Sequence, residues 1–202
     1  MIRRKFIRTI ARAVGVSIAS ITGLGAFANL LKRKDAANPV LGEPEVIRPP
    51  GALENEIDFL SQCIRCTRCR DACPTGAIKL AGFGDSAQLG TPYILPFESA
   101  CNLSLACTTT CPTEALQLLI LTKDVHMGRA VVDERTCVSH NGTGVCGACH
   151  TACPFKNFAI TQGPHNAPTV HEDRCVGCGL CEEACIVEGI KAIRVYSGRQ
   201  LV

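Results

Sequence analysis

The chain has 202 residues but only two Tyr, seven Phe and no Trp, which excludes a core of ordinary aromatic content. It has 15 cysteines, an odd number, which excludes intramolecular disulfides as their whole explanation and leaves bound metal as the main alternative. The net charge of +3 comes from residues 1–31, which hold five basic and no acidic residues; the other 16 basic and 18 acidic residues form no basic patch that would favour nucleic acid.

Residues 1–31 are typical of an export signal. They begin "MIRRKF", with paired arginines, and residues 13–31 form an uncharged stretch of 19 residues. The pattern resembles a twin-arginine translocation signal, which implies export to the periplasm of a protein already folded around its cofactors. At about 1.5 Å per residue, this stretch nearly spans a hydrocarbon core of about 30 Å. The signal is therefore expected either to be removed after "AFA" at 26–28 or to remain as an inner-membrane anchor.

A linker and a short helix are expected next. Residues 32–52 contain four prolines and no amphipathic period, which indicates an extended linker. A helix over about Leu53–Gln62, with Ile57 and Leu60 on one face, is predicted to lead into a cysteine-rich domain over residues 53–202.

This domain carries four cysteine motifs. Motif one is Cys63, Cys66, Cys69 and Cys73; motif two is Cys101, Cys107 and Cys111; motif three is Cys137, Cys146, Cys149 and Cys153; motif four is Cys175, Cys178, Cys181 and Cys185. Motifs one and four have the spacing of bacterial ferredoxins, in which three thiolates hold one [4Fe–4S] cluster and the fourth ligates a neighbouring cluster. Motif three has a longer first gap, "VSHNGTGV", which predicts a surface excursion. All 15 cysteines are therefore candidate cluster ligands.

Motif two lacks one cysteine. Counting back from Cys111 and Cys107 at the regular spacing places the second ligand at position 104, and Ser104 stands there. We therefore expect three [4Fe–4S] clusters and a fourth site with an incomplete thiolate set. That site is expected to hold a [3Fe–4S] cluster, a [4Fe–4S] cluster whose fourth iron takes Ser104, another side chain or water, or no cluster.

The motifs also predict the fold. Each is followed by a turn and an apolar segment suited to a short strand, in "CPTGAIKL", "CPTEALQLL", "CPFKNFAI" and "CIVEGIKAI". This repetition predicts an α+β iron–sulfur protein of two ferredoxin-like modules, each with two motifs, short strands and short helices. Clusters and cysteines would replace the aromatic residues of an ordinary core.

Zinc, covalent haem and disulfides also use cysteines, and each fits this pattern less well than clusters do. Zinc sites favour two separated CxxC pairs, whereas here three or four cysteines lie within eleven residues. Covalent haem would use Cys146, Cys149 and His150, but it would take two ligands from motif three. Disulfides would compete only in protein that had lost its clusters. We expect neither haem nor zinc, and we expect the remaining histidines to be exposed or locally hydrogen-bonded: His126, His140, His165 and His171.

Several segments around the motifs resemble the NapG/MauM group of periplasmic polyferredoxins. They are "IRPPGALENE", "GTPY", "HMGRAVV" and "PTVHEDRCVGCGLC", and the likeness covers nearly the whole chain. It implies a four-cluster electron carrier that works with a polytopic, NapH-like membrane quinol dehydrogenase and delivers electrons to a periplasmic reductase. In that group motif two has four cysteines and a longer gap before the third, so this chain departs from the group at Ser104.

No arrangement of acid, base and nucleophile indicates a free-standing enzyme, so the sequence favours an electron relay. The alternatives are the iron–sulfur subunit of a larger oxidoreductase, of hydrogenase or molybdopterin type, and a redox maturation factor. Charge also differs between the motifs, which predicts a higher potential for the first cluster than for the fourth. Motif one holds three arginines and motif four holds two acids: Arg65, Arg68 and Arg70, and Glu182 and Glu183.

Overall fold

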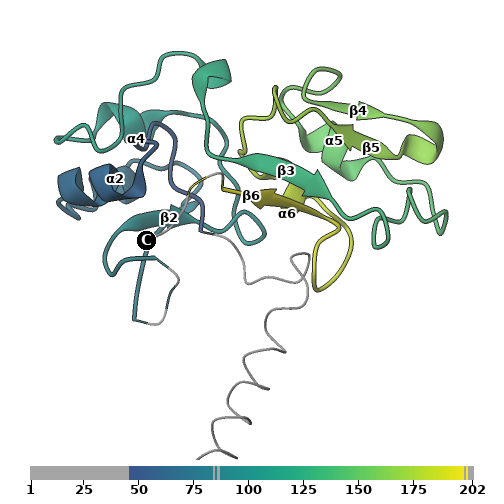
Figure 1. Cartoon of the computed structure of the whole chain (residues 1–202), viewed down its shortest axis with the longest axis horizontal. Helices are drawn as coiled ribbons and strands as arrows, with labels where there is room; N and C mark the ends of the chain where they lie inside the picture. Colours follow the sequence, from purple (N-terminus) through teal and green to yellow (C-terminus); the bar gives the residue numbers. More distant parts are fainter. Residues whose placement is uncertain (1–45, 84, 86, 198, 200–202) are drawn as a thin grey trace, which may run out of the picture. The chain divides into compact units, whose positions relative to one another are not determined.

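The computed structural model describes residues 46–83, 85, 87–197 and 199 (Figure 1). The expected export signal and most of the expected linker lie outside these residues. Within the described part of the chain, no helix has the length and apolar character needed to cross a membrane.

The domain is built from short helices and short strands, as the sequence predicts for a small mixed α/β protein. The helices are Glu56–Gln62 (α2), Arg68–Asp71 (α3), Ala106–Thr109 (α4), Ala148–Ala152 (α5) and Leu180–Glu183 (α6), with 3-10 turns at Thr122–Asp124 (η1) and Pro164–Asn166 (η2). The strands are Ile78–Leu80 (β1), Pro92–Ile94 (β2), Arg129–Val132 (β3), Ile160–Gln162 (β4), Pro168–Val170 (β5) and Ile193–Tyr196 (β6).

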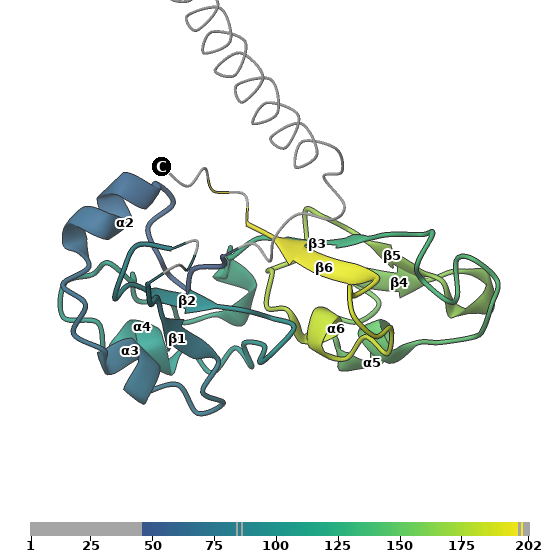
Figure 2. The same ribbon diagram turned by 90° about the horizontal axis from the view of Figure 1, so that it is seen from below.

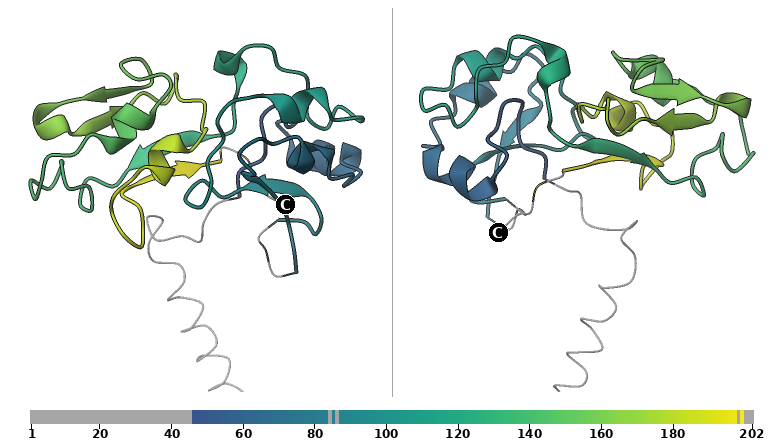
Figure 3. Two further views of the ribbon diagram at one scale, coloured as in Figure 1. Left: turned by 180° about the vertical axis from the view of Figure 1, so that it is seen from behind. Right: turned by 45° about the horizontal axis from the view of Figure 1, so that its top comes forward.

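The strands form three antiparallel pairs (Figure 2). Strand β1 pairs with β2, with Ile78 opposite Ile94, and β4 pairs with β5, with Ile160 opposite Val170. Strand β3 pairs with β6 although the two are far apart in the sequence, and the views of Figure 3 show them side by side. Each pair joins a segment that follows one cysteine motif to a segment that precedes another.

Three of the four apolar segments after the motifs form the expected strands, namely β1, β4 and β6. The segment after motif two does not. Leu116 makes a single bridge to Ala52, and the N–H of Gln117 donates to the carbonyl of Gly51 at 2.7 Å. The chain then leaves the core with Ile120 83% exposed, so no further ladder forms there.

Helix α2 begins three residues later than predicted and turns a different face inward. The side-chain oxygen of Asn55 accepts a hydrogen bond from the N–H of Ile57 at 2.8 Å and caps the helix. Phe59 is fully buried, whereas Ile57 is 57% exposed. Of the two residues on the predicted face, Leu60 is partly buried and packs on the core whereas Ile57 does not, and Glu56 is buried beside an arginine.

That arginine belongs to residues 46–52, which the sequence assigned to the linker. Arg48 is fully buried and forms an ion pair with Glu56. Its guanidinium also donates to Thr91 Oγ1 at 2.9 Å and to the carbonyl of Pro92 at 2.7 Å, and it lies 4.8 Å from the ring centre of Phe59. Residues 46–52 therefore belong to the folded domain, and the predicted boundary at 52 is corrected.

Cysteines make up a large part of the core, in line with the scarcity of aromatic side chains. One cluster of buried residues joins Ile47, Phe59 and Ile193 to six cysteine side chains. These are Cys69, Cys101, Cys107, Cys149, Cys178 and Cys181.

Candidate metal centres

Two cavities are each lined by four cysteines from two motifs. Cys63, Cys66 and Cys69 of motif one share the first cavity with Cys111, the last cysteine of motif two. The second cavity is lined by four cysteines of motifs three and four: Cys137, Cys146, Cys149 and Cys185. The fourth thiol thus comes from the partner motif, as it does in two-cluster ferredoxins.

The other cysteines form two further groups. The Cys107 thiol lies within electrostatic range of Cys101, of Cys69, which lines the first cavity, and of Cys73, the last cysteine of motif one; Cys101 is also within range of Cys73. Cys181 lies within the same range of Cys178, Cys175 and Cys153, and of Cys149, which lines the second cavity; Cys153 and Cys178 are each within range of Cys175. The four groups are numbered by motif: site one is Cys63, Cys66, Cys69 and Cys111; site two is Cys73, Cys101 and Cys107 with Ser104; site three is Cys137, Cys146, Cys149 and Cys185; site four is Cys153, Cys175, Cys178 and Cys181.

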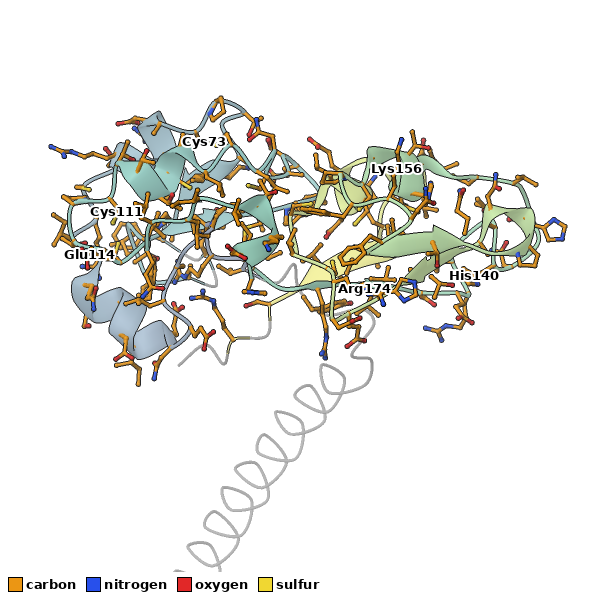
Figure 4. All side chains as sticks on the ribbon, turned by 90° about the horizontal axis from the view of Figure 1, so that it is seen from above. Cys73, Cys111, Glu114, His140, Lys156 and Arg174 are labelled. Atoms are coloured by element: carbon orange, nitrogen blue, oxygen red, sulfur yellow. The ribbon has the colours of Figure 1, made fainter. Side chains whose placement is uncertain are left out.

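Cys73 and Cys111 lie in the same part of the molecule (Figure 4). Each of these cysteines ends a motif, shortly after helix α3 or α4, and the two helices are in contact. Helices α5 and α6 are in contact in the same way, which brings motifs three and four together.

Ser104 occupies the backbone position of a second ligand. In motif one, Cys66 is flanked by left-handed residues, Arg65 at φ 56° and Thr67 at φ 65°. In motif two the residues on either side of Ser104 have the same conformation, Leu103 at φ 60° and Leu105 at φ 58°. Motif four repeats it around Cys178 with Gly177 and Gly179. The cysteine spacing and the backbone conformation therefore agree on the place of Ser104.

Motif three follows a different path. Gly147, between Cys146 and Cys149, is extended at φ 177°, and the N–H of Cys146 donates to Ser139 Oγ at 2.9 Å. The excursion before Cys146 is exposed at residues 141–143 and 145, and it is turned by Asn141, whose side chain accepts from the N–H of Thr143 at 3.0 Å. The longer first gap thus allows the ligands to converge without a left-handed pair.

Hydrogen-bond donors are directed at several sulfur atoms. The N–H groups of Leu103, Leu116 and Ala130 each lie 3.4 Å from a cysteine Sγ, of Cys101, Cys111 and Cys175 respectively. The hydroxyls of two threonines add to them: Thr75 lies 3.6 Å from Cys73 Sγ, and Thr113 lies 3.8 Å from Cys111 Sγ. Such donors stabilise negative charge on cluster ligands and set cluster potentials.

Some of the thiols have pKa values raised by burial, and two have pKa values lowered by hydrogen bonds. Burial, reinforced by neighbouring cysteines, raises the pKa of Cys69 to about 11 and that of Cys107 to about 12. It likewise raises the pKa of Cys178 to about 12. Burial also acts to raise the pKa of Cys73 and Cys111, but hydrogen bonds from the following amides and threonine hydroxyls outweigh it, so both pKa values are lowered.

The donor sets fit iron–sulfur clusters. They are soft thiols, which surround a cavity at sites one and three, and N–H and O–H groups are directed at several of the sulfur atoms. Within the described ranges, no three His, Cys, Asp or Glu side chains converge closely enough for one metal ion. At site two, Cys101 and Cys107 are buried, whereas Ser104 is exposed, so the position without a cysteine faces solvent.

Several charged residues near the sites already have hydrogen-bond or ion-pair partners. Arg65 donates to the carbonyl of Leu89 at 3.1 Å, and Arg70 is paired with Asp71 at 2.8 Å. Glu182 is buried, accepts from the N–H of Val195 at 2.7 Å, and has a pKa raised by burial. The predicted order of potentials remains a prediction.

Three histidines have a hydrogen-bond partner nearby, and the other two are exposed. His140, His150 and His171 each have Nε2 within 3.1 Å of an oxygen atom, in Pro168, Asn157 and Thr161 respectively. His126 and His165 are exposed.

Sequence reasoning missed three groups that shape the sites. Thr75 and Thr113 contact sulfur, and the repeated triplet Cys-Pro-Thr is the signal that would have found them. The third is Gly179, which lies against Pro96. No local pattern predicts that contact.

Comparison with known proteins gives a consistent result. A family model described as a 4Fe-4S dicluster domain matches residues 62–115 and 143–188, so each match covers all or most of two motifs. The chain is 40% identical to the methylamine utilization ferredoxin-type protein MauM of Paracoccus denitrificans, over 96% of this chain and 86% of the relative. It is 38% identical to MauM of Methylorubrum extorquens, over 90% and 84% of the two chains. It is 36% identical to the ferredoxin-type protein NapG of Escherichia coli, over 92% and 82%.

Proposed function

Because the chain belongs to the family of iron–sulfur ferredoxin-type proteins that includes MauM and NapG, we propose that it relays electrons from a membrane quinol dehydrogenase to a periplasmic redox acceptor. The observation that carries this proposal is the arrangement of its cysteines in four neighbouring groups. A series of one-electron sites is what a relay requires.

The 15 cysteines are the proposed ligands, divided among sites one to four. Motifs one and two would form one ferredoxin-like module, and motifs three and four would form the second. The two matches to the dicluster model and the contacts of α3 with α4 and of α5 with α6 support this division. Sites one, three and four have four thiols each and fit [4Fe–4S] clusters, while site two has three thiols and fits a [3Fe–4S] cluster or a [4Fe–4S] cluster with a non-cysteine ligand.

When bound, the clusters supply one-electron transfer. The protein's own residues would hold the thiolates, and seven of the 15 cysteines are buried. Backbone amides and the two threonine hydroxyls stabilise charge on sulfur. The thiols with raised pKa values must lose their protons to bind iron, so loading of the sites releases protons.

Export through the twin-arginine route is part of the proposal. It is supported by the paired arginines and the uncharged stretch of residues 13–31. Replacing Arg3 and Arg4 with Lys should leave the cluster-loaded protein in the cytoplasm, as measured by cell fractionation. Export of the double variant at the wild-type level would contradict the route.

The second candidate function is that of an iron–sulfur subunit bound permanently in a larger oxidoreductase. It is favoured because one loop presents several apolar side chains to solvent. Leu118, Ile120 and Leu121 are all exposed in the loop that follows motif two. Soluble monomers seldom show such a row, whereas subunit interfaces use it. Copurification of the chain in fixed proportion with a catalytic subunit would favour this candidate.

The relay is tested with the whole chain and its membrane partner. Anaerobic membranes that contain the NapH-like protein and this chain are given a quinol analogue, and bleaching of the cluster absorbance is followed. We expect reduction only when both the partner and the quinol are present. Reduction by dithionite but never by quinol would contradict the relay, and transfer of clusters to an apoprotein would favour a maturation factor.

A further inference from the structure

The sites are interlocked in pairs by exchange of ligands. Cys73 follows α3 but lies with the thiols of site two, and Cys111 follows α4 but lines the cavity of site one. Cys153 and Cys185 are exchanged in the same way between sites three and four. Site one therefore adjoins site two, and site three adjoins site four.

Contact between the pairs occurs at sites two and four. The backbone N–H of Cys101, in site two, donates to the carbonyl oxygen of Cys178, in site four, at 3.0 Å. Gly179, the next residue, lies so close to Pro96 that an added Cβ would stand 2.4 Å from the proline Cβ. A single backbone hydrogen bond thus links the two buried cysteines, Cys101 and Cys178. At position 179, next to this hydrogen bond, only glycine fits against Pro96.

Sites one and three lie away from this contact. The cavity of site one is lined only by residues between 59 and 116, and that of site three only by residues between 132 and 193. Each has exposed apolar side chains beside its ligands. Ile64 follows Cys63, while Val145 precedes Cys146 and Ile186 follows Cys185.

We propose that the four sites form a series in the order one, two, four, three, so that electrons enter and leave at sites one and three and cross the middle of the protein between Cys101 and Cys178. This order rests on the proposed relay function. Each step oxidises one site by one electron and reduces its neighbour by one electron, and no bond forms or breaks. The source is a quinol, which gives up two electrons and two protons outside this chain.

In this series, electrons that enter or leave at site one must pass through site two. Site two is an inner member of the series, next to site four, and not a terminal site. An empty site two would separate site one from the rest. The position of Ser104 is therefore expected to lie beside a filled cluster on the path itself.

Magnetic coupling between reduced clusters tests the order. The full-length protein is purified anaerobically with its clusters, reduced with dithionite and examined by EPR. One variant loses site four through Cys175→Ala and Cys181→Ala; a second loses site three through Cys137→Ala and Cys146→Ala. Without site four, site three should give the spectrum of an isolated cluster, whereas without site three, site four should stay coupled to site two. The reverse pair of results, expected for a series in chain order, would overturn the proposal.

A milder pair of variants guards against loss of folding. Gly179→Ala places a Cβ against Pro96, whereas Gly189→Ala has a similar positive φ, 71° against 86°, and meets nothing within 4 Å. With the iron content unchanged in both, Gly179→Ala should weaken the coupling of sites two and four, and Gly189→Ala should leave it intact. Equal magnetic coupling in the two variants would contradict the inference that sites two and four are coupled at this contact. Because dithionite replaces quinol, these results do not depend on the membrane partner, and failure of the relay would appear only in the quinol experiment.

Discussion

Ser104 is the residue at which this protein departs most clearly from the ferredoxin pattern. Leu103 and Leu105 hold the left-handed conformation around it, at a cost of about 1–2 kcal/mol each, just as Arg65 and Thr67 do around Cys66. The ligand loop is thus preserved although its cysteine is absent. Since Cys101 and Cys107 are buried and Ser104 is exposed, the incomplete corner of site two is open to water.

Changing Ser104 to Cys completes four thiolates at site two. If the wild type holds a three-iron cluster, we expect a gain of about one iron per chain; if it holds a four-iron cluster with an oxygen ligand, we expect a changed potential at site two. Iron analysis and potentiometric EPR measure both. Ser61→Cys adds an exposed thiol in α2 as the control, and identical iron content and spectra in all three proteins would contradict the assignment.

Thr75 and Thr113 are expected to raise the potentials of sites two and one. A hydrogen bond to sulfur stabilises the more negative, reduced state, and its net value of about 0.5–1.5 kcal/mol corresponds to roughly 20–65 mV. Thr75→Val should lower the midpoint of site two, and Thr113→Val that of site one. Thr109→Val, whose hydroxyl bonds the carbonyl of Ala106, is the matched control. Unchanged midpoints in the first two variants would show that the threonine hydroxyls do not tune the clusters.

Arg68 is the arginine of motif one best suited to raise the potential of site one. A unit charge about 7 Å away at an effective dielectric of about 20 contributes roughly 2 kcal/mol, and less where the charge is exposed. Arg68 is exposed, so its effect should be on the order of half of that 2 kcal/mol. Arg68→Gln should therefore lower the midpoint potential of site one by tens of mV. Arg70→Gln should have a smaller effect, because Arg70 is already paired with Asp71. Equal shifts in potentiometric EPR would argue against tuning by Arg68.

At the scale of elements, local sequence pattern predicts most of the strands but not the contacts made between distant segments. Local pattern predicts β1, β4 and β6 correctly because each of these apolar segments pairs with another strand. The prediction fails after motif two because only Leu116 of that segment makes a bridge. It also fails at residues 46–52. Prolines and the lack of a period suggest a linker there, but burial depends on Arg48 finding Glu56, a contact that local pattern does not reveal.

The Arg48–Glu56 pair is predicted to hold helix α2 on the domain. Glu56→Ala leaves a buried guanidinium without its counter-charge, which typically costs about 3–5 kcal/mol. The loss should appear as a lower temperature for the disappearance of cluster absorbance. Glu54→Ala removes an exposed acid just before the helix and should change that temperature little. Comparable effects of the two substitutions would mean that the buried pair contributes nothing.

At the scale of the whole molecule, the sequence predicts the ligands, whereas the proposed order of the sites comes from contacts between distant segments. The ferredoxin rule predicts that each motif lends its last cysteine to another site, and the cavities of sites one and three show Cys111 and Cys185 in those places. The meeting of sites two and four was not predictable. It depends on Cys101 with Cys178 and on Gly179 with Pro96, residues far apart in the chain with no shared period.

Counting the electrons that one chain accepts is the most direct test of a four-site relay. The full-length protein, purified anaerobically with its clusters, is titrated with dithionite while absorbance and EPR are recorded and iron is quantified. The four cysteine groups predict four one-electron reductions per chain, one of them with the properties of an incompletely thiolate-ligated cluster. Uptake of three electrons or fewer by fully loaded protein, with no signal from site two, would contradict a four-site relay.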